Sequence, residues 1–158
     1  MQARLDYRAA SPRGFAAMAH LSNFVERCGL EAPLLELVKM RASQINGCAF
    51  CLDMHSKDAV AGGEDPQRLY TLPAWRETPF FSDRERAALA WTEAVTEIAV
   101  AHIDDALFAE MRRHFSEREL VDLTLAVVTI NGWNRLAIPF RSEVGGYQPG
   151  GDRRAPDE

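Results

Sequence analysis

The sequence predicts an all-α protein, a single-domain helical bundle of about six to eight helices. Apolar residues recur at helical spacing in most segments, and helix start signals stand directly before them. Nowhere does the chain alternate apolar and polar residues over a convincing strand. With 158 residues, of which 47% are hydrophobic, it is long enough to bury one core without a metal or a disulfide.

The first two helices are expected over residues 12–27 and 33–46. Ser11 is a capping residue before a proline that suits the opening turn of the first helix, and Gly29 ends that helix. The second helix carries a stripe of leucine, valine and methionine that stops before Gly47. Both helices therefore have an apolar face to bury.

A third helix is expected to begin at or just before Cys48 and to run to about residue 61, where two glycines follow. A short helical piece follows at 65–70. Residues 73–81 hold two prolines and mixed aromatic residues without a clear period, which is typical of a connecting segment.

Two capping boxes open helices in the second half of the chain, at residues 82–85 and 116–119. The first precedes a helix that continues to Ile98. A shorter helix starts at Asp104 or Asp105 and includes Met111. The second box precedes the stretch 120–138, which is apolar nearly all round and is therefore expected to be the buried central helix.

Composition and charge exclude several classes of function. The net charge is -5, and no basic stripe is present to meet phosphates, so nucleic acid is not an expected partner. Charges interrupt the N-terminus, and no apolar run suits a signal peptide or a membrane span, which favours a cytoplasmic protein without membrane contact. We expect the domain to cover residues 1–144 and the glycine- and proline-rich residues 145–158 to form a flexible or subunit-contacting tail.

The strongest chemical signal is a Cys-x-x-Cys motif followed by a histidine, formed by Cys48, Cys51 and His55. On one helix this spacing places the three side chains on a single face. The helix N-terminus and the imidazole both favour the thiolate, so Cys51 and His55 form a candidate nucleophile and base, with Cys48 as the resolving thiol. Cys28 is left as the spare cysteine, with packing its expected role.

Glu36 is the fourth candidate site residue. The turn at Gly47 folds the second helix back against the third, which would let the Glu36 carboxylate orient His55 or pass protons to it. A sulfenic acid on Cys51 would then be captured by Cys48 as a disulfide, and an external dithiol would reopen it.

Two other interpretations of the motif remain open. Zinc could bind Cys48, Cys51 and His55, with the missing ligand supplied by Glu36, His102 or His114, although structural zinc more often uses two separated ligand pairs. Alternatively, the cysteine pair could switch oligomer or partner contacts in a redox or stress-response protein that catalyses nothing. The leading interpretation requires no metal and no cofactor.

The pattern of Glu36, eleven residues, and then the Cys-Cys-His motif resembles the alkylhydroperoxidase D-like core of the carboxymuconolactone decarboxylase superfamily. The stretch INGCAFCLDMHSKDA carries the most specific part of the resemblance. The resemblance implies homo-oligomers, commonly trimers or hexamers, with dimer-based assembly as an option. It also implies weak thiol-dependent peroxidase activity on hydrogen or organic peroxides, with a dithiol electron donor.

The same resemblance implies roles for the four site residues. Cys51 attacks the peroxide, Cys48 resolves the sulfenic acid, His55 is the base, and Glu36 starts a proton relay. One departure is that Phe50 stands where mycobacterial-type members carry a second histidine between the cysteines. Decarboxylases of the superfamily lack the cysteine pair, so their activity on a lactone acid is not implied.

Overall fold

The computed structural model describes residues 2–150, which form eight α-helices and one 3-10 helix without any strand. The predicted all-helical fold is confirmed. The elements are α1 (Tyr7–Ala10), α2 (Pro12–Glu26), α3 (Ala32–Asn46), α4 (Ala49–Ala61), α5 (Pro66–Thr71), the 3-10 helix η1 (Leu72–Glu77), α6 (Asp83–Thr96), α7 (Asp105–His114) and α8 (Glu117–Phe140).

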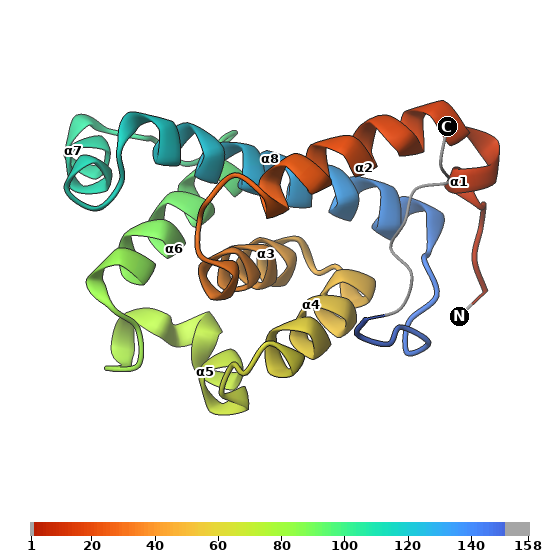
Figure 1. Ribbon diagram of the computed structural model, residues 1–158, viewed down its shortest axis with the longest axis horizontal. Coiled ribbons are helices and arrows are strands. Elements are labelled where there is room, and N and C mark those ends of the chain that lie inside the picture. Colours follow the sequence, from red (N-terminus) through yellow and green to blue (C-terminus); the bar gives the residue numbers. More distant parts are fainter. Residues whose placement is uncertain (1, 151–158) are drawn as a thin grey trace.

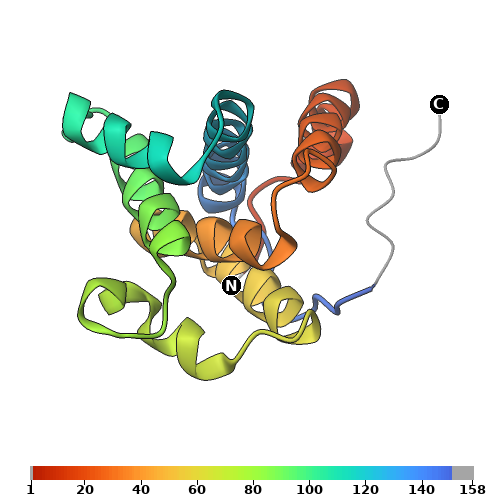
Figure 2. The ribbon, with the colours of Figure 1, turned by 60° about the vertical axis from the view of Figure 1, so that its left-hand side comes forward.

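The helices pack around α3, which contacts α4, α6 and α8. In Figure 1, α2 and α8 run along one side of the molecule, and α3 and α4 lie beneath them. Figure 2 shows α3 crossing beneath α8 and beside α6. The larger part of the core lies where α2, α3, α6, α7 and α8 meet, and its most deeply buried side chains include Val38, Ala88, Met111, Leu123 and Val127.

Local sequence signals set most helix boundaries. Both predicted capping boxes are present, with reciprocal bonds between Ser82 and Glu85 and between Ser116 and Glu119. Gly47 ends α3 in the left-handed conformation with φ 69°, which only glycine adopts at little cost. Ser11 stands at the N-cap of α2 as expected, but its side chain makes no capping hydrogen bond.

Two short elements were not predicted. The first is the helix α1, which is capped by the Asp6 side chain. The second is η1, which begins at Leu72 and includes Pro73 of the expected connecting segment. Each is about one or two turns long, a length at which helices in water depend on packing rather than on their own sequence. In addition, α6 ends at Thr96, two residues before the predicted Ile98, which is 65% exposed.

The helix α8 is central as predicted and contacts α2, α3, α4, α6 and α7, but one side of it is exposed. Leu123, Val127 and Asn134 are fully buried against the other helices. Val121 and Val128, by contrast, are 59% and 49% exposed. Because these two residues are seven apart, they lie on the same side of the helix. The outer side of α8 therefore exposes these two valines in the single chain, beside the exposed Arg118 and Arg135.

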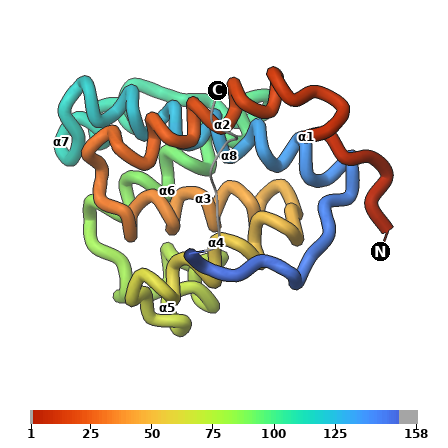
Figure 3. Tube along the Cα trace, turned by 45° about the vertical axis from the view of Figure 1, so that its right-hand side comes forward, coloured from red at the N-terminus to blue at the C-terminus, as the bar shows by residue number. Residues whose placement is uncertain are grey.

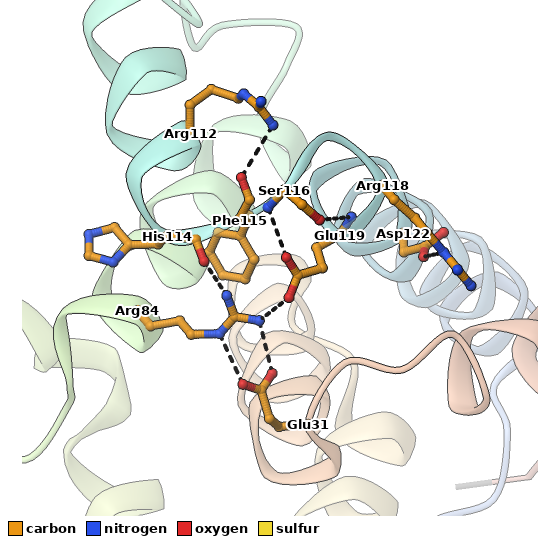
Figure 4. Close-up of polar contacts among 9 residues, drawn as sticks. All are labelled: Glu31, Arg84, Arg112, His114, Phe115, Ser116, Arg118, Glu119 and Asp122. Atoms are coloured by element: carbon orange, nitrogen blue, oxygen red, sulfur yellow. Dashed lines mark hydrogen bonds and ion pairs between the residues drawn. The ribbon is translucent and has the colours of Figure 1, made fainter.

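Arg84 joins the ends of three helices near α7 (Figure 4). Its guanidinium donates to Glu31 before α3, to Glu119 in the first turn of α8, and to the backbone oxygen of His114 at the end of α7. It also lies over the ring of Phe115. One side chain on α6 therefore fixes the relative positions of α3, α7 and α8.

The two terminal segments of the described chain lie against the bundle (Figure 3). Arg4 bonds through its backbone N–H to the Phe140 oxygen at the end of α8. At the C-terminal segment, the backbone N–H of Gly145 donates to Asp53 of α4, so the first residues of the expected tail lie on α4. Residues 151–158 of that tail lie outside the described residues, and its predicted role stays a prediction. None of the described helices is both long enough and apolar enough to cross a membrane.

Candidate active site

The two motif cysteines lie at the start of α4. Cys48 is the N-cap residue rather than part of the first helical turn, and its sulfur accepts the backbone N–H of Cys51 at 3.4 Å. The two residues are joined as a disulfide, with Cα atoms 5.4 Å apart. Each is 1% exposed, and they pack against Ile130 and Ala137 of α8. The sulfur atoms are thus held between α4 and α8.

The structure brings Glu36 of α3 directly beside His55 of α4. The Oε2 atom of Glu36 lies 2.9 Å from Nδ1 of His55, whose side chain is only 6% exposed. This contact joins residues 19 positions apart through the turn at Gly47. The two side chains are therefore in contact, as predicted, while their roles remain predictions.

The charge of Glu36 fixes how the histidine ring is held. Burial opposes the ionised carboxylate, but the hydrogen bond and charge of His55 and the ammonium of Lys39 outweigh it and lower the pKa of Glu36 to about 2. An ionised carboxylate can only accept hydrogen bonds, so Nδ1 of His55 carries the hydrogen atom in this contact. In a neutral ring, Nε2 then has the free lone pair that a base needs.

Cys51 and His55 open onto one cavity of about 520 Å³. Its apolar walls include Phe15 of α2, Phe50 of α4 and Trp133 of α8. Cys48 is not among the lining residues, so Cys51 is the motif cysteine that the cavity reaches. A cavity of this size with aromatic walls can hold a small organic molecule against the cysteine and the histidine.

Three residues near the histidine were not predicted from the sequence. Lys39 bonds to Glu36 at 2.8 Å, and the Tyr147 hydroxyl donates to Asp58 at 2.6 Å. Lys39 and Tyr147 also line the cavity. Their spacing gave no distinct signal, because a Glu–Lys pair three residues apart is common on helix surfaces and Tyr147 comes from the expected tail. Only the fold brings Lys39 and Tyr147 to the site.

The zinc interpretation finds limited support in the geometry. Of the three candidate fourth ligands, Glu36 lies at the site, whereas His114 bonds to Glu110 on α7 and His102 is exposed ahead of α7. Glu36, His55 and Asp58 do place ligand atoms within 4.8 Å of one another, a donor set of two carboxylates and an imidazole. That set does not include the cysteines.

A buried amide network supports the turn that leads into Cys48. Asn46, the last residue of α3, donates to the side-chain oxygens of Asn131 and Asn134 on α8, at 3.0 and 2.8 Å. Asn134 in turn donates to Ser43 of α3. These polar groups of the apolar helix therefore find their partners inside the chain and fix the end of α3 to α8.

Comparison with known proteins identifies the family. A model of the carboxymuconolactone decarboxylase family matches residues 9–94 of the chain. The uncharacterized protein YdfG of Bacillus subtilis is 41% identical over 138 residues, which are 87% of this chain and 94% of the relative. The chain belongs to the carboxymuconolactone decarboxylase family. The matched residues of the chain include the whole segment from Glu36 to His55.

Solved structures share the fold of this chain. A protein of unknown function from Agrobacterium tumefaciens, named as a candidate antioxidant defence protein AhpD, is 44% identical, with a TM-score of 0.89 over 92% of this chain and 100% of the other. The resemblance to the alkylhydroperoxidase D-like core is thereby confirmed. The debrominase Bmp8, solved with 2,3,4-tribromopyrrole, shares the fold at 21% identity and a TM-score of 0.78, over 87% of this chain and 74% of its own.

Proposed function

We propose that the protein is a thiol-dependent peroxidase that reduces hydrogen peroxide or organic hydroperoxides. The observation that carries this proposal is the shared cavity: Cys51 and His55 both line it, and Cys51 is already bonded to Cys48 behind it. A nucleophile, a base and a resolving thiol therefore meet where a small substrate can enter. The family membership and the similar AhpD-type protein agree with this chemistry.

The oxidative half of the cycle starts from the reduced cysteines. The Cys51 thiolate attacks one oxygen of the peroxide, the O–O bond breaks, and the departing oxygen leaves as an alcohol or water after taking a proton. His55 first takes the thiol proton and then returns a proton to the leaving oxygen, with Glu36 holding its ring. Cys51 is then a sulfenic acid.

The reductive half restores both thiols. Cys48 attacks the Cys51 sulfenic acid, which forms the disulfide and releases water. A dithiol donor attacks the disulfide through a mixed disulfide and leaves as its own cyclic or linear disulfide, so that two electrons pass from donor to peroxide in each turn. Because the cavity reaches Cys51 and not Cys48, we assign the donor's attack to Cys51.

A peroxidase assay with purified protein tests the proposal. With dithiothreitol or dihydrolipoamide as reductant, the wild-type protein should consume hydroperoxide, and Cys51→Ser should reduce the rate at least about a hundredfold. Cys28→Ala is the matched control, because Cys28 is buried in the core and away from the cavity. Undiminished turnover in Cys51→Ser would overturn the proposal.

Mass spectrometry after one equivalent of hydroperoxide, combined with a steady-state turnover assay, separates the peroxidase from a non-catalytic redox protein. Both require a Cys48–Cys51 disulfide and a free Cys28 in the product. Rapid disulfide formation without steady turnover under any dithiol would instead favour a redox or stress-response protein that switches contacts. A disulfide that includes Cys28 would contradict both mechanisms.

The proposal includes a homo-oligomer, as a trimer or hexamer. The exposed valines of α8, Val121 and Val128, favour association of copies. Sedimentation equilibrium of the reduced and oxidised protein checks the assembly. A monomer at all concentrations would contradict this part of the proposal.

A further inference from the structure

Lys39 occupies an unusual position for a lysine. Its ammonium lies 2.8 Å from Oε1 of Glu36, and its side chain is only 12% exposed. The same spacing of three residues joins Glu110 and Arg113 on α7, where the two side chains are 44% and 75% exposed. Charged lysines are seldom buried unless they are paired, so the Glu36–Lys39 contact differs from an ordinary surface pair.

The two oxygen atoms of Glu36 are shared between two partners. Oε1 faces the Lys39 ammonium and Oε2 faces Nδ1 of His55. A carboxylate held at both oxygens cannot rotate freely, so the direction of the His55 ring is set as well. The lysine also supplies one positive charge to a buried carboxylate, which would otherwise favour a protonated imidazole as its counter-charge.

We propose that Lys39 is a positioning residue for His55, and that it acts through Glu36 to keep the imidazole neutral, with its hydrogen on Nδ1 and its Nε2 lone pair free. This inference rests on the proposed function only in that a neutral His55 is the base for Cys51. Lys39 itself pairs with Glu36 and forms no bond during the reaction.

Other charged or titratable groups also surround His55. Asp58 of α4 lies near it and accepts a hydrogen bond from Tyr147 of the C-terminal segment. Glu26 of α2 and Arg8 of α1 line the same cavity, and the cavity residues that α8 contributes are uncharged. The cation that contacts Glu36 is Lys39.

Nitrogen-15 NMR of the His55 ring in the oxidised protein tests the proposal without any turnover. The disulfide form avoids a contribution from the Cys51 thiolate. In the wild-type protein, the neutral ring should carry its hydrogen on Nδ1. In Lys39→Met the ring should stay protonated to a pH about one unit higher, a tenfold change in the ratio of the two forms. Lys39→Arg should restore the wild-type midpoint.

Arg113→Met is the matched control, since it removes one cation from an exposed pair of the same spacing and should leave the His55 midpoint unchanged. Lys39→Gln serves as a second variant if Lys39→Met does not fold. An unchanged midpoint in a folded Lys39 variant would overturn the proposal, even if activity falls. Absence of turnover in the wild-type protein would instead reject the proposed function and leave this measurement valid.

Discussion

At Glu36, a single buried carboxylate links a lysine on its own helix to a histidine on the next. Its side chain is 16% exposed, and without partners this burial would raise its pKa. The contacts with His55 and Lys39 reverse that effect and lower the pKa from 4.5 to about 2. The ionised form is therefore favoured in the folded protein relative to the unfolded chain.

Glu36 should make the folded state sensitive to acid in a defined range. Because its folded pKa is lowered, its contribution is fully present above about pH 4.5 and is lost as the pH falls towards 2. Between pH 5.5 and pH 3 the wild-type protein should lose on the order of 2 kcal/mol more stability than Glu36→Gln. Urea unfolding at both pH values measures this difference.

Glu110→Gln is the matched control for this experiment, because it removes an exposed carboxylate from α7. Its loss of stability between the two pH values should follow that of the wild-type protein. Equal acid sensitivity in the wild-type protein and Glu36→Gln would contradict the lowered pKa of Glu36.

Among the elements, the junction of α3, α7 and α8 depends on one arginine from α6. Hydrogen bonds from the backbone and hydroxyl of Ser116, together with Arg84, lower the pKa of Glu119 to about 2. The capping box and the arginine therefore use the same carboxylate, which starts α8 and ties it to α6.

Arg84→Met should destabilise the fold by about 1–2 kcal/mol, because it removes three charged or backbone contacts and leaves their partners on separate helices. Arg112→Met provides the comparison at the same junction, since Arg112 donates to the nearby backbone oxygen of Phe115 and to Glu117, which is 90% exposed. That variant should change stability by less than about 0.5 kcal/mol. Thermal or urea unfolding of both variants measures the difference, and equal effects would contradict the role of Arg84.

The turn between α3 and α4 offers a second prediction at the scale of elements. Asn134 is fully buried and accepts from Asn46, the residue before the Gly47 turn. Asn134→Leu should leave the Asn46 amide and Ser43 without this partner and cost about 2–3 kcal/mol. Asn131→Leu, at a less buried position, should cost less. Urea unfolding measures both, and a stabilised Asn134→Leu protein would contradict this network.

The elements also show which structural features the sequence encodes locally. The capping boxes at Ser82 and Ser116 were predicted because each lies within four residues. The helix α1 was not, since it has only four residues and depends, besides the Asp6 cap, on distant contacts such as that between the Tyr7 and Phe140 rings. The exposed side of α8 was missed because an apolar helix surface has the same sequence whether it faces a core or another molecule.

At the scale of the whole molecule, the candidate site also has parts that local sequence encodes and parts that depend on distant contacts. The pairing of Glu36 with His55 could be predicted, because one tight turn separates their helices. The cavity could not, since its walls come from both ends of the chain, with Tyr7 and Arg8 on one side and residues 146–148 on the other. No local pattern specifies that both segments line the cavity that reaches Cys51.

Tyr147 connects the C-terminal segment to the site and should therefore influence which peroxides are accepted. It lines the cavity, bonds to Asp58 through its hydroxyl, and accepts from Lys57 through its backbone oxygen. Tyr147→Ala removes apolar wall area that a bulky substrate would contact and a small one would not. We expect kcat/KM for cumene hydroperoxide to fall about three- to tenfold, with little change for hydrogen peroxide.

Two variants make this measurement specific. Tyr147→Phe keeps the aromatic wall and loses the bond to Asp58, so it should retain most of the preference for cumene hydroperoxide. Tyr70→Ala removes a tyrosine that is 76% exposed on α5 and does not line the cavity, so both rates should stay at wild-type values. If Tyr147→Ala lowers the two rates equally, the segment supports the catalytic residues rather than the bound substrate, because only a contact with the substrate can distinguish one peroxide from another.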